Sequence, residues 1–119
     1  INLLRSRLTL FNNLSIINPK YLGGAKEALL QASIKAPTDA KLFYNLGIIY
    51  LKTGEVSNSL DTFNKAINLK PNYKEARLVY ALTLSKNNIV GDAKEQLLYI
   101  IEKIDPNDKT AKEELNKLK

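Results

Sequence analysis

Side chains that commonly perform catalysis are scarce in this sequence. The 119 residues include no cysteine and no histidine, which excludes a thiol nucleophile, a Ser-His-Asp triad and zinc sites built from these side chains. Acid–base chemistry would then depend on paired carboxylates or on a lysine with a lowered pKa. The candidates all fall on positions that helical periodicity assigns to an outward, solvated face: Asp61, Asp92, Glu95, Glu113 or Glu114, Lys65, Lys70 and Lys94. We therefore expect no enzyme activity, no catalytic or metal-binding residue and no cofactor.

Charge and composition restrict the partners further. The net charge of +6 is concentrated in residues 1–37, but the basic side chains there are scattered, so we expect a solvated surface and no specific nucleic-acid site. The pair Gly23-Gly24 lacks the other residues of a phosphate-binding loop and is expected to form a turn ahead of a helix. No stretch reaches the ~18–20 unbroken apolar residues of a membrane span. Because the chain begins with isoleucine and contains no methionine, we expect a fragment of a longer protein, with a cytoplasmic location favoured and a membrane-tethered parent still open.

The elements that position these side chains follow a repeat. When the sequence is shifted by 34 residues it aligns with itself, and the aligned sets are Ala25, Ser59 and Ala93; Glu27, Asp61 and Glu95; Leu29, Phe63 and Leu97; and Ala32, Ala66 and Ile100. Pro37 and Pro71 keep the same step, and Pro106 comes one residue late. Each proline ends a segment whose apolar residues recur with helical spacing. A repeat of this length predicts helical hairpins stacked side by side, an all-α fold of the α-α superhelix type.

One segment carries the clearest motif. Its characteristic residues are Phe43, Leu46, Gly47, Tyr50, Gly54, Ser59, Phe63, Ala66 and Pro71. In these residues the segment 40–73 resembles the tetratricopeptide repeat, with Phe in place of the usual Trp and Ser in place of the first Ala. The resemblance implies a solenoid of about three such helix-turn-helix repeats followed by a C-terminal capping helix.

Residue sizes predict the packing within this segment. Gly47 is small and lies inside an expected helix, a position that indicates the close approach of another backbone. Tyr50 and Phe63 are expected to fill the wedge between the two helices. Gly54 is expected to adopt the left-handed conformation that ends the first helix.

The chain is predicted to form a single domain, 1–119. Within it, residues 1–39 are a degenerate first repeat, 40–73 a well-formed repeat, 74–107 an eroded repeat and 108–119 a capping helix. The expected helices of the repeats span about 2–17, 24–35, 40–52, 56–69, 74–86 and 90–104. Asn88 takes the turn position of the eroded repeat, and the extra residue before Pro106 is expected at the end of its second helix.

The first helix of each repeat lines the concave side of such a superhelix. Counted from Ala40, the inward positions are Lys41, Tyr44, Asn45, Ile48 and Lys52, then Glu75, Leu78, Val79, Leu82 and Lys86, with Arg7, Leu10, Phe11 and Leu14 upstream. They predict a peptide-binding groove with an apolar floor and basic edges, suited to an amphipathic helix or an extended peptide. Packing of Leu78, Val79 and Leu82 against neighbouring helices is an equal alternative.

The predicted function is a non-catalytic scaffold that binds a protein or peptide segment in this groove. The tetratricopeptide family that this chain resembles includes domains that clamp a chaperone's terminal carboxylate with lysine and asparagine. Asn45 stands at one such position, but Glu75 and Val79 replace the two basic residues, and Glu75 would repel a carboxylate. Two alternatives stay open. One is self-assembly through the N-terminal helix; the other is a soluble regulatory tail, because the sequence from Ala36 onward is similar to the C-terminal repeat tails of bacterial membrane O-antigen ligases or polymerases.

Overall fold

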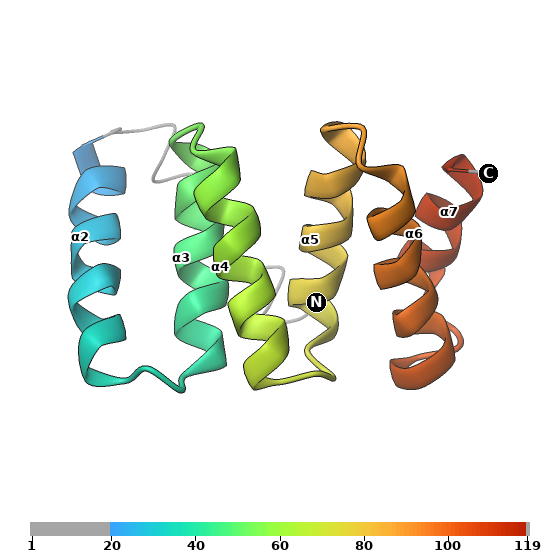
Figure 1. Ribbon diagram of the computed structural model, residues 1–119, viewed down its shortest axis with the longest axis horizontal. Helices are drawn as coiled ribbons and strands as arrows, with labels where there is room; N and C mark the ends of the chain where they lie inside the picture. The colour runs from blue at the N-terminus through green and yellow to red at the C-terminus, as the bar shows by residue number, and fades with distance from the viewer. Residues whose placement is uncertain (1–19, 119) are drawn as a thin grey trace.

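A row of helices makes up the described part of the chain. The computed structural model describes residues 20–118, with side chains from Gly23 onward, and every regular element in this part is helical. The elements are α2 (Lys20–Lys35), α3 (Ala40–Lys52), α4 (Val56–Leu69), α5 (Lys74–Lys86), α6 (Val90–Tyr99), η1 (Ile100–Ile104) and α7 (Lys109–Lys117). They stand side by side in chain order, from α2 at one end to α7 at the other (Figure 1). The fold is therefore the all-α superhelix of stacked hairpins that the repeat predicts.

Most helix boundaries agree with the sequence prediction. The helices α3, α4 and α5 occupy the predicted ranges 40–52, 56–69 and 74–86. The helix α2 ends at Lys35 as predicted, but its predicted start is wrong, because it begins at Lys20 and runs through Gly23-Gly24 without a turn. Glycine lowers helix propensity by about 1 kcal/mol relative to alanine, which weakens a helix without ending it. The predicted helix 2–17 and its groove positions Arg7, Leu10, Phe11 and Leu14 lie outside the described residues.

Turns and caps between the helices use the expected residues. Gly54 and Asn88 both adopt positive φ, at 78° and 63°, and each follows the first helix of a hairpin. Glycine and asparagine are the residues that tolerate this left-handed conformation best. Asp39 and Asp108 cap α3 and α7, where each carboxylate accepts a hydrogen bond from the backbone N–H three residues on, at 3.3 and 2.7 Å.

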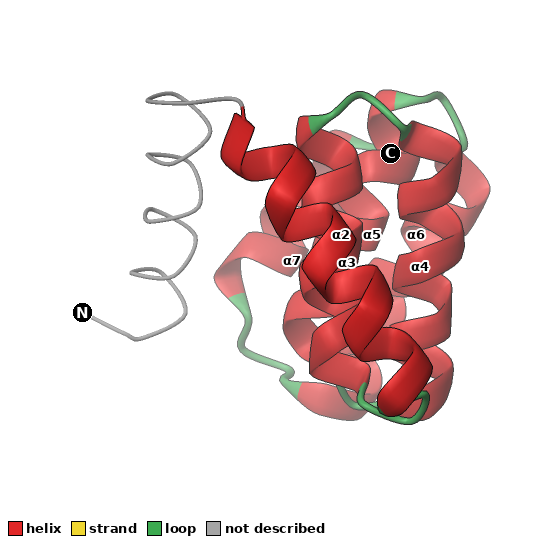
Figure 2. Cartoon of the chain, turned by 90° about the vertical axis from the view of Figure 1, so that its left-hand side faces the viewer, coloured by secondary structure: helices red, strands yellow, loops and turns green. Residues whose placement is uncertain are grey.

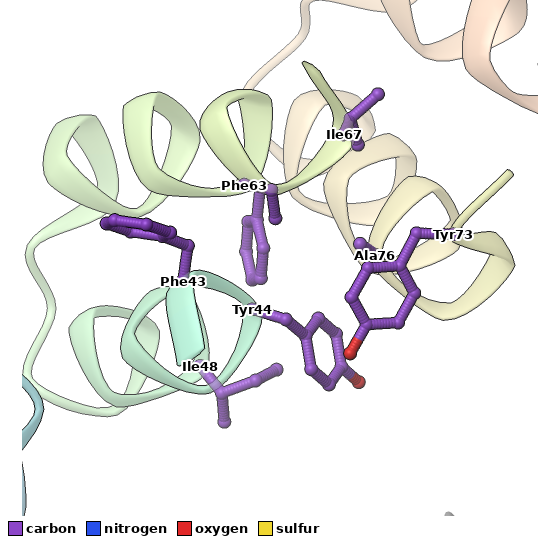
Figure 3. Close-up of a cluster of buried hydrophobic side chains, with 8 residues drawn as sticks. Phe43, Tyr44, Ile48, Phe63, Ile67, Tyr73 and Ala76 are labelled. Carbon is purple, nitrogen blue, oxygen red and sulfur yellow. The ribbon is translucent and has the colours of Figure 1, made fainter. Parts of the chain in front are cut away.

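The core of the α3/α4 hairpin closes around one aromatic ring. Phe63 is fully buried, and a Cβ atom added to Gly47 would lie only 2.6 Å from its Cε1 atom. The close approach predicted at Gly47 is thus made by a side-chain ring rather than by backbone. The cluster around this contact, seen in Figure 3, consists of Phe43, Tyr44, Ile48, Phe63, Ile67, Tyr73 and Ala76, and Ala66 belongs to it as well. Tyr50, predicted to fill the wedge together with Phe63, is half-buried, and the Lys26 ammonium of α2 lies 5.9 Å from its ring centroid.

A second core joins α5, α6 and α7. Its buried members are Ala81, Leu97, Ile100 and Ala111, and Leu78, Ile101, Ile104, Leu115 and Leu118 pack against them. The extra residue expected before Pro106 is accommodated in η1, a π-helical turn. There the backbone N–H of Asp105 donates to the carbonyl of Ile100, five residues earlier, at 2.7 Å.

The second helices of the two complete hairpins share one side of the row. Figure 2 looks along the row from its α2 end and shows α4 and α6 lying together on that side.

A candidate binding cleft between α3 and α5

Two successive hairpins form a cleft where α3 and α5 end. The cleft has a volume of about 460 Å³. Its lining residues are Ile48, Leu51 and Lys52 of α3, Val56 at the start of α4, Val79, Leu82, Thr83 and Lys86 of α5, and Asn87 just after α5. Because the walls come from different hairpins, the spacing of the two repeats fixes the width of the cleft.

The lining combines an apolar floor with two cations. Five of the nine lining residues are aliphatic, and the two charged ones, Lys52 and Lys86, are exposed. Two polar side chains of the lining bond to α5: the Thr83 hydroxyl donates to the Val79 carbonyl, and the exposed Asn87 amide donates one hydrogen bond to the Thr83 carbonyl, both at 2.8 Å. The cleft therefore offers mainly apolar contact, together with two lysine ammonium groups and the exposed Asn87 amide.

The structure brings five of the predicted groove residues to this cleft: Ile48, Lys52, Val79, Leu82 and Lys86. The other five described positions lie elsewhere. Lys41 is exposed on α3, Asn45 and Glu75 are half-buried, Tyr44 is buried, and Leu78 packs against the second core. Whether a partner touches any of these residues stays a prediction.

Tyr44 supports the cleft from within the core. It is 4% exposed, and its ring centroid lies 6.1 Å from that of Phe63 and 5.3 Å from that of Tyr73. Burial, with a smaller contribution from the nearby Glu75 carboxylate, raises the pKa of Tyr44 to about 12. Its hydroxyl is buried and has no hydrogen-bond partner among the described residues. Tyr44 thus helps to position Ile48 and the α5 helix.

Four lining residues were not predicted from the sequence: Leu51, Val56, Thr83 and Asn87. Leu51 and Val56 flank the turn between α3 and α4, and the other two lie where α5 ends. A count of inward positions along the first helices does not reach them. The sequence does place apolar residues on both sides of Gly54. The turn at this glycine brings both of them to the cleft.

The acidic residue nearest to the cleft along the chain is already paired. Glu55 precedes Val56, and its carboxylate accepts from the Lys26 ammonium of α2 at 2.8 Å and from the Thr53 hydroxyl. The hydrogen bond from Lys26 contributes most to lowering the pKa of Glu55, and the one from Thr53 adds to it. The hydrogen bond to Glu55 in turn raises the pKa of Lys26. The pair ties α2 to the turn beside the cleft.

The described residues 20–118 do not form a metal site. No three Asp, Glu, His or Cys side chains come together there in a way that would hold a metal ion. Asp61, Asp92, Glu95 and Glu113 are exposed. None of the described helices is both long enough and apolar enough to cross a bilayer.

Comparison with known proteins identifies the fold of this chain. The family model of the tetratricopeptide repeat matches residues 40–73. The chain has the tetratricopeptide-type solenoid fold. No curated protein matches the chain in sequence.

Two solved structures illustrate the likeness. The second TPR domain of human RPAP3, determined by NMR in complex with the HSP70 peptide SGPTIEEVD, gives a TM-score of 0.75 at 20% identity, over 90% of this chain and 87% of that domain. The type III secretion translocator chaperone SycD of Yersinia enterocolitica gives a TM-score of 0.73 at 13% identity, over 97% of this chain and 82% of that one. At these identities the comparison concerns the fold alone.

Proposed function

We propose that this chain is a non-catalytic protein-interaction scaffold that binds a peptide segment in the cleft between α3 and α5. The observation that carries the proposal is a cleft of about 460 Å³ with an apolar floor, built by two consecutive repeats on their first helices. Pockets of roughly 300–1,000 Å³ are large enough to bury most of a ligand of moderate size. The RPAP3 domain, whose fold is similar, was solved with a peptide bound.

Apolar burial would supply most of the affinity. Leu51, Val79 and Leu82 present aliphatic surface that is not fully covered by the chain itself. Each Å² of apolar surface removed from water contributes about 25 cal/mol. One or two apolar side chains of a partner seated on this floor would therefore anchor a helix or an extended segment.

A clamp for a terminal carboxylate fits the described residues poorly. Val79 lies in the cleft and offers no charge, while Glu75 brings a carboxylate close enough to Tyr44 to raise the pKa of its hydroxyl. The other two functions predicted from the sequence, self-assembly through the N-terminal helix and a role as the tail of a bacterial membrane glycan ligase or polymerase, stay predictions.

Selection from a random peptide display library tests the proposed function. The folded chain is the bait, and each selected peptide is then measured against Leu82→Asp, which places a charge on the cleft floor. The matched control is Leu98→Asp, because Leu98 on α6 is 41% exposed and lies outside the cleft. Circular dichroism establishes that both variants keep their helices.

Peptides bound in the cleft should lose at least ~10-fold in affinity with Leu82→Asp, since each lost apolar anchor is worth about 1.5–3 kcal/mol. They should bind Leu98→Asp as they bind the unchanged chain. Equal losses in both variants, or peptides indifferent to Leu82→Asp, would refute a site in this cleft, as would a library that gives no binder.

A further inference from the structure

We infer that the N-terminal segment 1–19 of this chain places apolar side chains in the cleft between α3 and α5, and that a bound partner displaces it. The inference rests on the proposed function and adds an occupant from the same chain that competes with the partner. The segment itself lies outside the described residues. Three observations support it: the apolar floor of the cleft, the place where the segment joins α2, and the composition of the segment.

The segment joins the described chain at the end of the row where the cleft opens. Lys20 begins α2. Further along this helix, the Lys26 ammonium lies 2.8 Å from the Glu55 carboxylate and 5.9 Å from the ring centroid of Tyr50, near the end of α3. Glu55 directly precedes Val56, a lining residue of the cleft. Figure 1 shows the start of α2 at the same edge of the row as the turns that follow α3 and α5.

The length of the segment is sufficient to span the distance to the cleft. An extended chain covers up to ~3.5 Å per residue, so Leu10, ten positions before Lys20, can lie as far as ~35 Å from it. A helix with its side chains is only about 10–12 Å wide, and α2 packs directly against α3, which forms one wall of the cleft. A short tether gives an effective concentration on the order of 1 mM, so a weak apolar contact is enough for occupancy.

The composition of the segment suits an apolar floor. Nine of its 19 residues are isoleucine, leucine or phenylalanine, and none is acidic. Leu4, Leu8 and Phe11 recur at the i, i+4, i+7 spacing of one helical face. In the cleft, Leu51 and Leu82 present aliphatic surface that the described chain does not fully cover. Contact between the two removes apolar surface from water on both sides, at about 25 cal/mol per Å².

Charge keeps this contact weak enough to be displaced. The segment contributes Arg5 and Arg7, and the lining of the cleft contains lysine but no carboxylate. Because like charges repel, apolar burial alone holds the segment in the cleft. A partner with more apolar contact then replaces it, and its apparent affinity is reduced by the fraction of chains whose cleft is open. The segment thus regulates access to the cleft.

Two charge-matched double variants of the full chain test the inference. The apolar double variant, Leu8→Asp/Phe11→Asp, removes two apolar side chains of the segment. The polar double variant, Ser6→Asp/Asn12→Asp, places the same two charges at polar positions of the segment. Both lower the formal net charge from +6 to +4, because each adds two carboxylates. Circular dichroism establishes that the helices are kept, and backbone amide chemical shifts are compared with those of the unchanged chain.

Without any peptide, the apolar double variant should shift the amide signals of Leu51, Val79 and Leu82, and the polar double variant should leave them nearly unchanged. A peptide selected for the cleft should bind the apolar double variant about 10-fold more tightly than the unchanged chain. This factor corresponds to a segment with an intrinsic Kd of ~0.1 mM at an effective concentration of ~1 mM. The peptide should bind the polar double variant as it binds the unchanged chain.

A spin label gives a second measurement that does not depend on removing apolar side chains. The chain contains no cysteine, so Ser6→Cys provides a single attachment site in the segment. The label should broaden the amide signals of Val79 and Leu82 more than those of Asp61 and Glu95, which lie outside the cleft. Adding a selected peptide should reverse the broadening. Broadening that is unaffected by a peptide bound in the cleft would overturn the inference.

The outcomes separate the inference from the proposed function. Shift changes confined to α2 would mean that the segment packs on this helix, as the predicted first repeat implies, and would overturn the inference. Equal peptide affinities of the two double variants would do the same. In either case, peptides lost with Leu82→Asp would leave the binding function intact. A cleft that responds to the apolar double variant, but for which the library yields no binder, would keep the segment as its occupant and overturn the binding function.

Discussion

The hairpins α3/α4 and α5/α6 have the same architecture and are held together differently. In α3/α4 the ring of Phe63 lies against Gly47, and the contacts around it are mainly apolar. In α5/α6 the position equivalent to Phe43 holds Arg77, which is only 8% exposed. Its Nε donates to the Pro71 carbonyl and one terminal nitrogen donates to the Gln96 side-chain oxygen, both at 2.7 Å.

Arg77 also stacks on an aromatic ring, a contact that adds to the difference between the two hairpins. The guanidinium carbon of Arg77 lies 3.5 Å from the ring centroid of Tyr99, so this cation covers an aromatic face as well as filling space. In α3/α4, by comparison, the buried side-chain oxygens of Tyr44 and Ser59 have no hydrogen-bond partners among the described residues. One backbone arrangement is thus specified by close apolar contact in the first hairpin and by satisfied polar contacts in the second. The two hairpins should therefore respond differently to changes in volume and in polarity.

The largest effect is expected from removing the aromatic ring of the first hairpin. Phe63→Ala should lower the free energy of unfolding by about 3–5 kcal/mol, because the ring is fully buried and its loss leaves a cavity beside Gly47. Urea denaturation followed by circular dichroism measures the loss. A loss below ~1 kcal/mol would show that the first hairpin does not depend on this contact.

The second hairpin should be most sensitive to its buried cation. Arg77→Met keeps much of the side-chain volume but leaves the Pro71 carbonyl and the Gln96 side chain without their donor. We expect a loss of about 1–3 kcal/mol in the free energy of unfolding, the usual cost of buried polar groups left unsatisfied. Lys112→Met, at an exposed position of α7, is the control and should change little. A neutral or stabilising Arg77→Met would mean that the polar contacts of this hairpin are dispensable.

Glycine-to-alanine substitutions should change the free energy of unfolding in opposite directions in the two hairpins. Gly47→Ala places a methyl group 2.6 Å from the buried Phe63 ring, an overpacking that costs about 1–3 kcal/mol against a gain of about 1 kcal/mol in helix propensity. A net destabilisation of about 1 kcal/mol is expected. Gly91→Ala on α6 meets no atom within 4 Å and should be neutral or stabilising by a few tenths of a kcal/mol. Thermal unfolding of the two variants measures both changes in stability. If Gly47→Ala stabilised the chain as Gly91→Ala does, the packing described for Gly47 would be contradicted.

The smallest effect concerns the polar connection from α5 to the capping helix. Asp108 accepts from the Ala111 backbone N–H at 2.7 Å and pairs with Lys74 at 2.9 Å. Although burial acts in the opposite direction, these contacts lower the pKa of Asp108 below its usual 3.8. Asp108→Ala should cost about 1 kcal/mol at pH 7, as is typical for a helix cap.

The pH dependence of this loss has a definite sign. A carboxyl group with a lowered pKa in the folded state contributes stability above its unfolded pKa, and this contribution is lost as the pH falls through the folded pKa. The difference between Asp108→Ala and the unchanged chain should therefore shrink below about pH 4. Asp39→Ala, which removes the cap of α3 with its longer 3.3 Å hydrogen bond, is the comparison within the first hairpin and should cost less. A difference that stays constant from pH 7 to pH 3 would contradict the role of the Asp108 charge.

Local sequence signals were sufficient wherever one residue determines the backbone. The left-handed turns at Gly54 and Asn88 and the ends of α3, α4 and α5 follow from residue type and spacing. The insertion before Pro106 located η1, although a count of residues cannot tell a π-turn from a longer helix. The turn predicted at Gly23-Gly24 is wrong, because two glycines lower helix propensity without preventing the helix from starting before them.

Contacts between elements were harder to predict. A helical period identifies which residues of α3 face inward, but it does not separate those that fill the core from those that line a surface. Tyr44 and Ile48 were assigned together to the groove, and Tyr44 packs with Phe63 and Tyr73 in the core while Ile48 also reaches the cleft. The partners of Arg77 are 6 and 19 residues away in the sequence: Pro71 lies in the turn before α5 and Gln96 on α6, so their assembly depends on how the turn and α6 pack against α5.

Backbone amide chemical shifts, recorded while a library-selected peptide is titrated into the folded chain, test the location of the binding site most directly. Binding in the cleft predicts that the largest shifts occur at Leu51, Val56, Val79, Leu82 and Lys86, which line it together. The exposed residues Asp61 of α4 and Glu95 and Leu98 of α6 should change little. Shifts confined to these α4 and α6 residues would place the binding site on the opposite side of the hairpins and contradict the cleft.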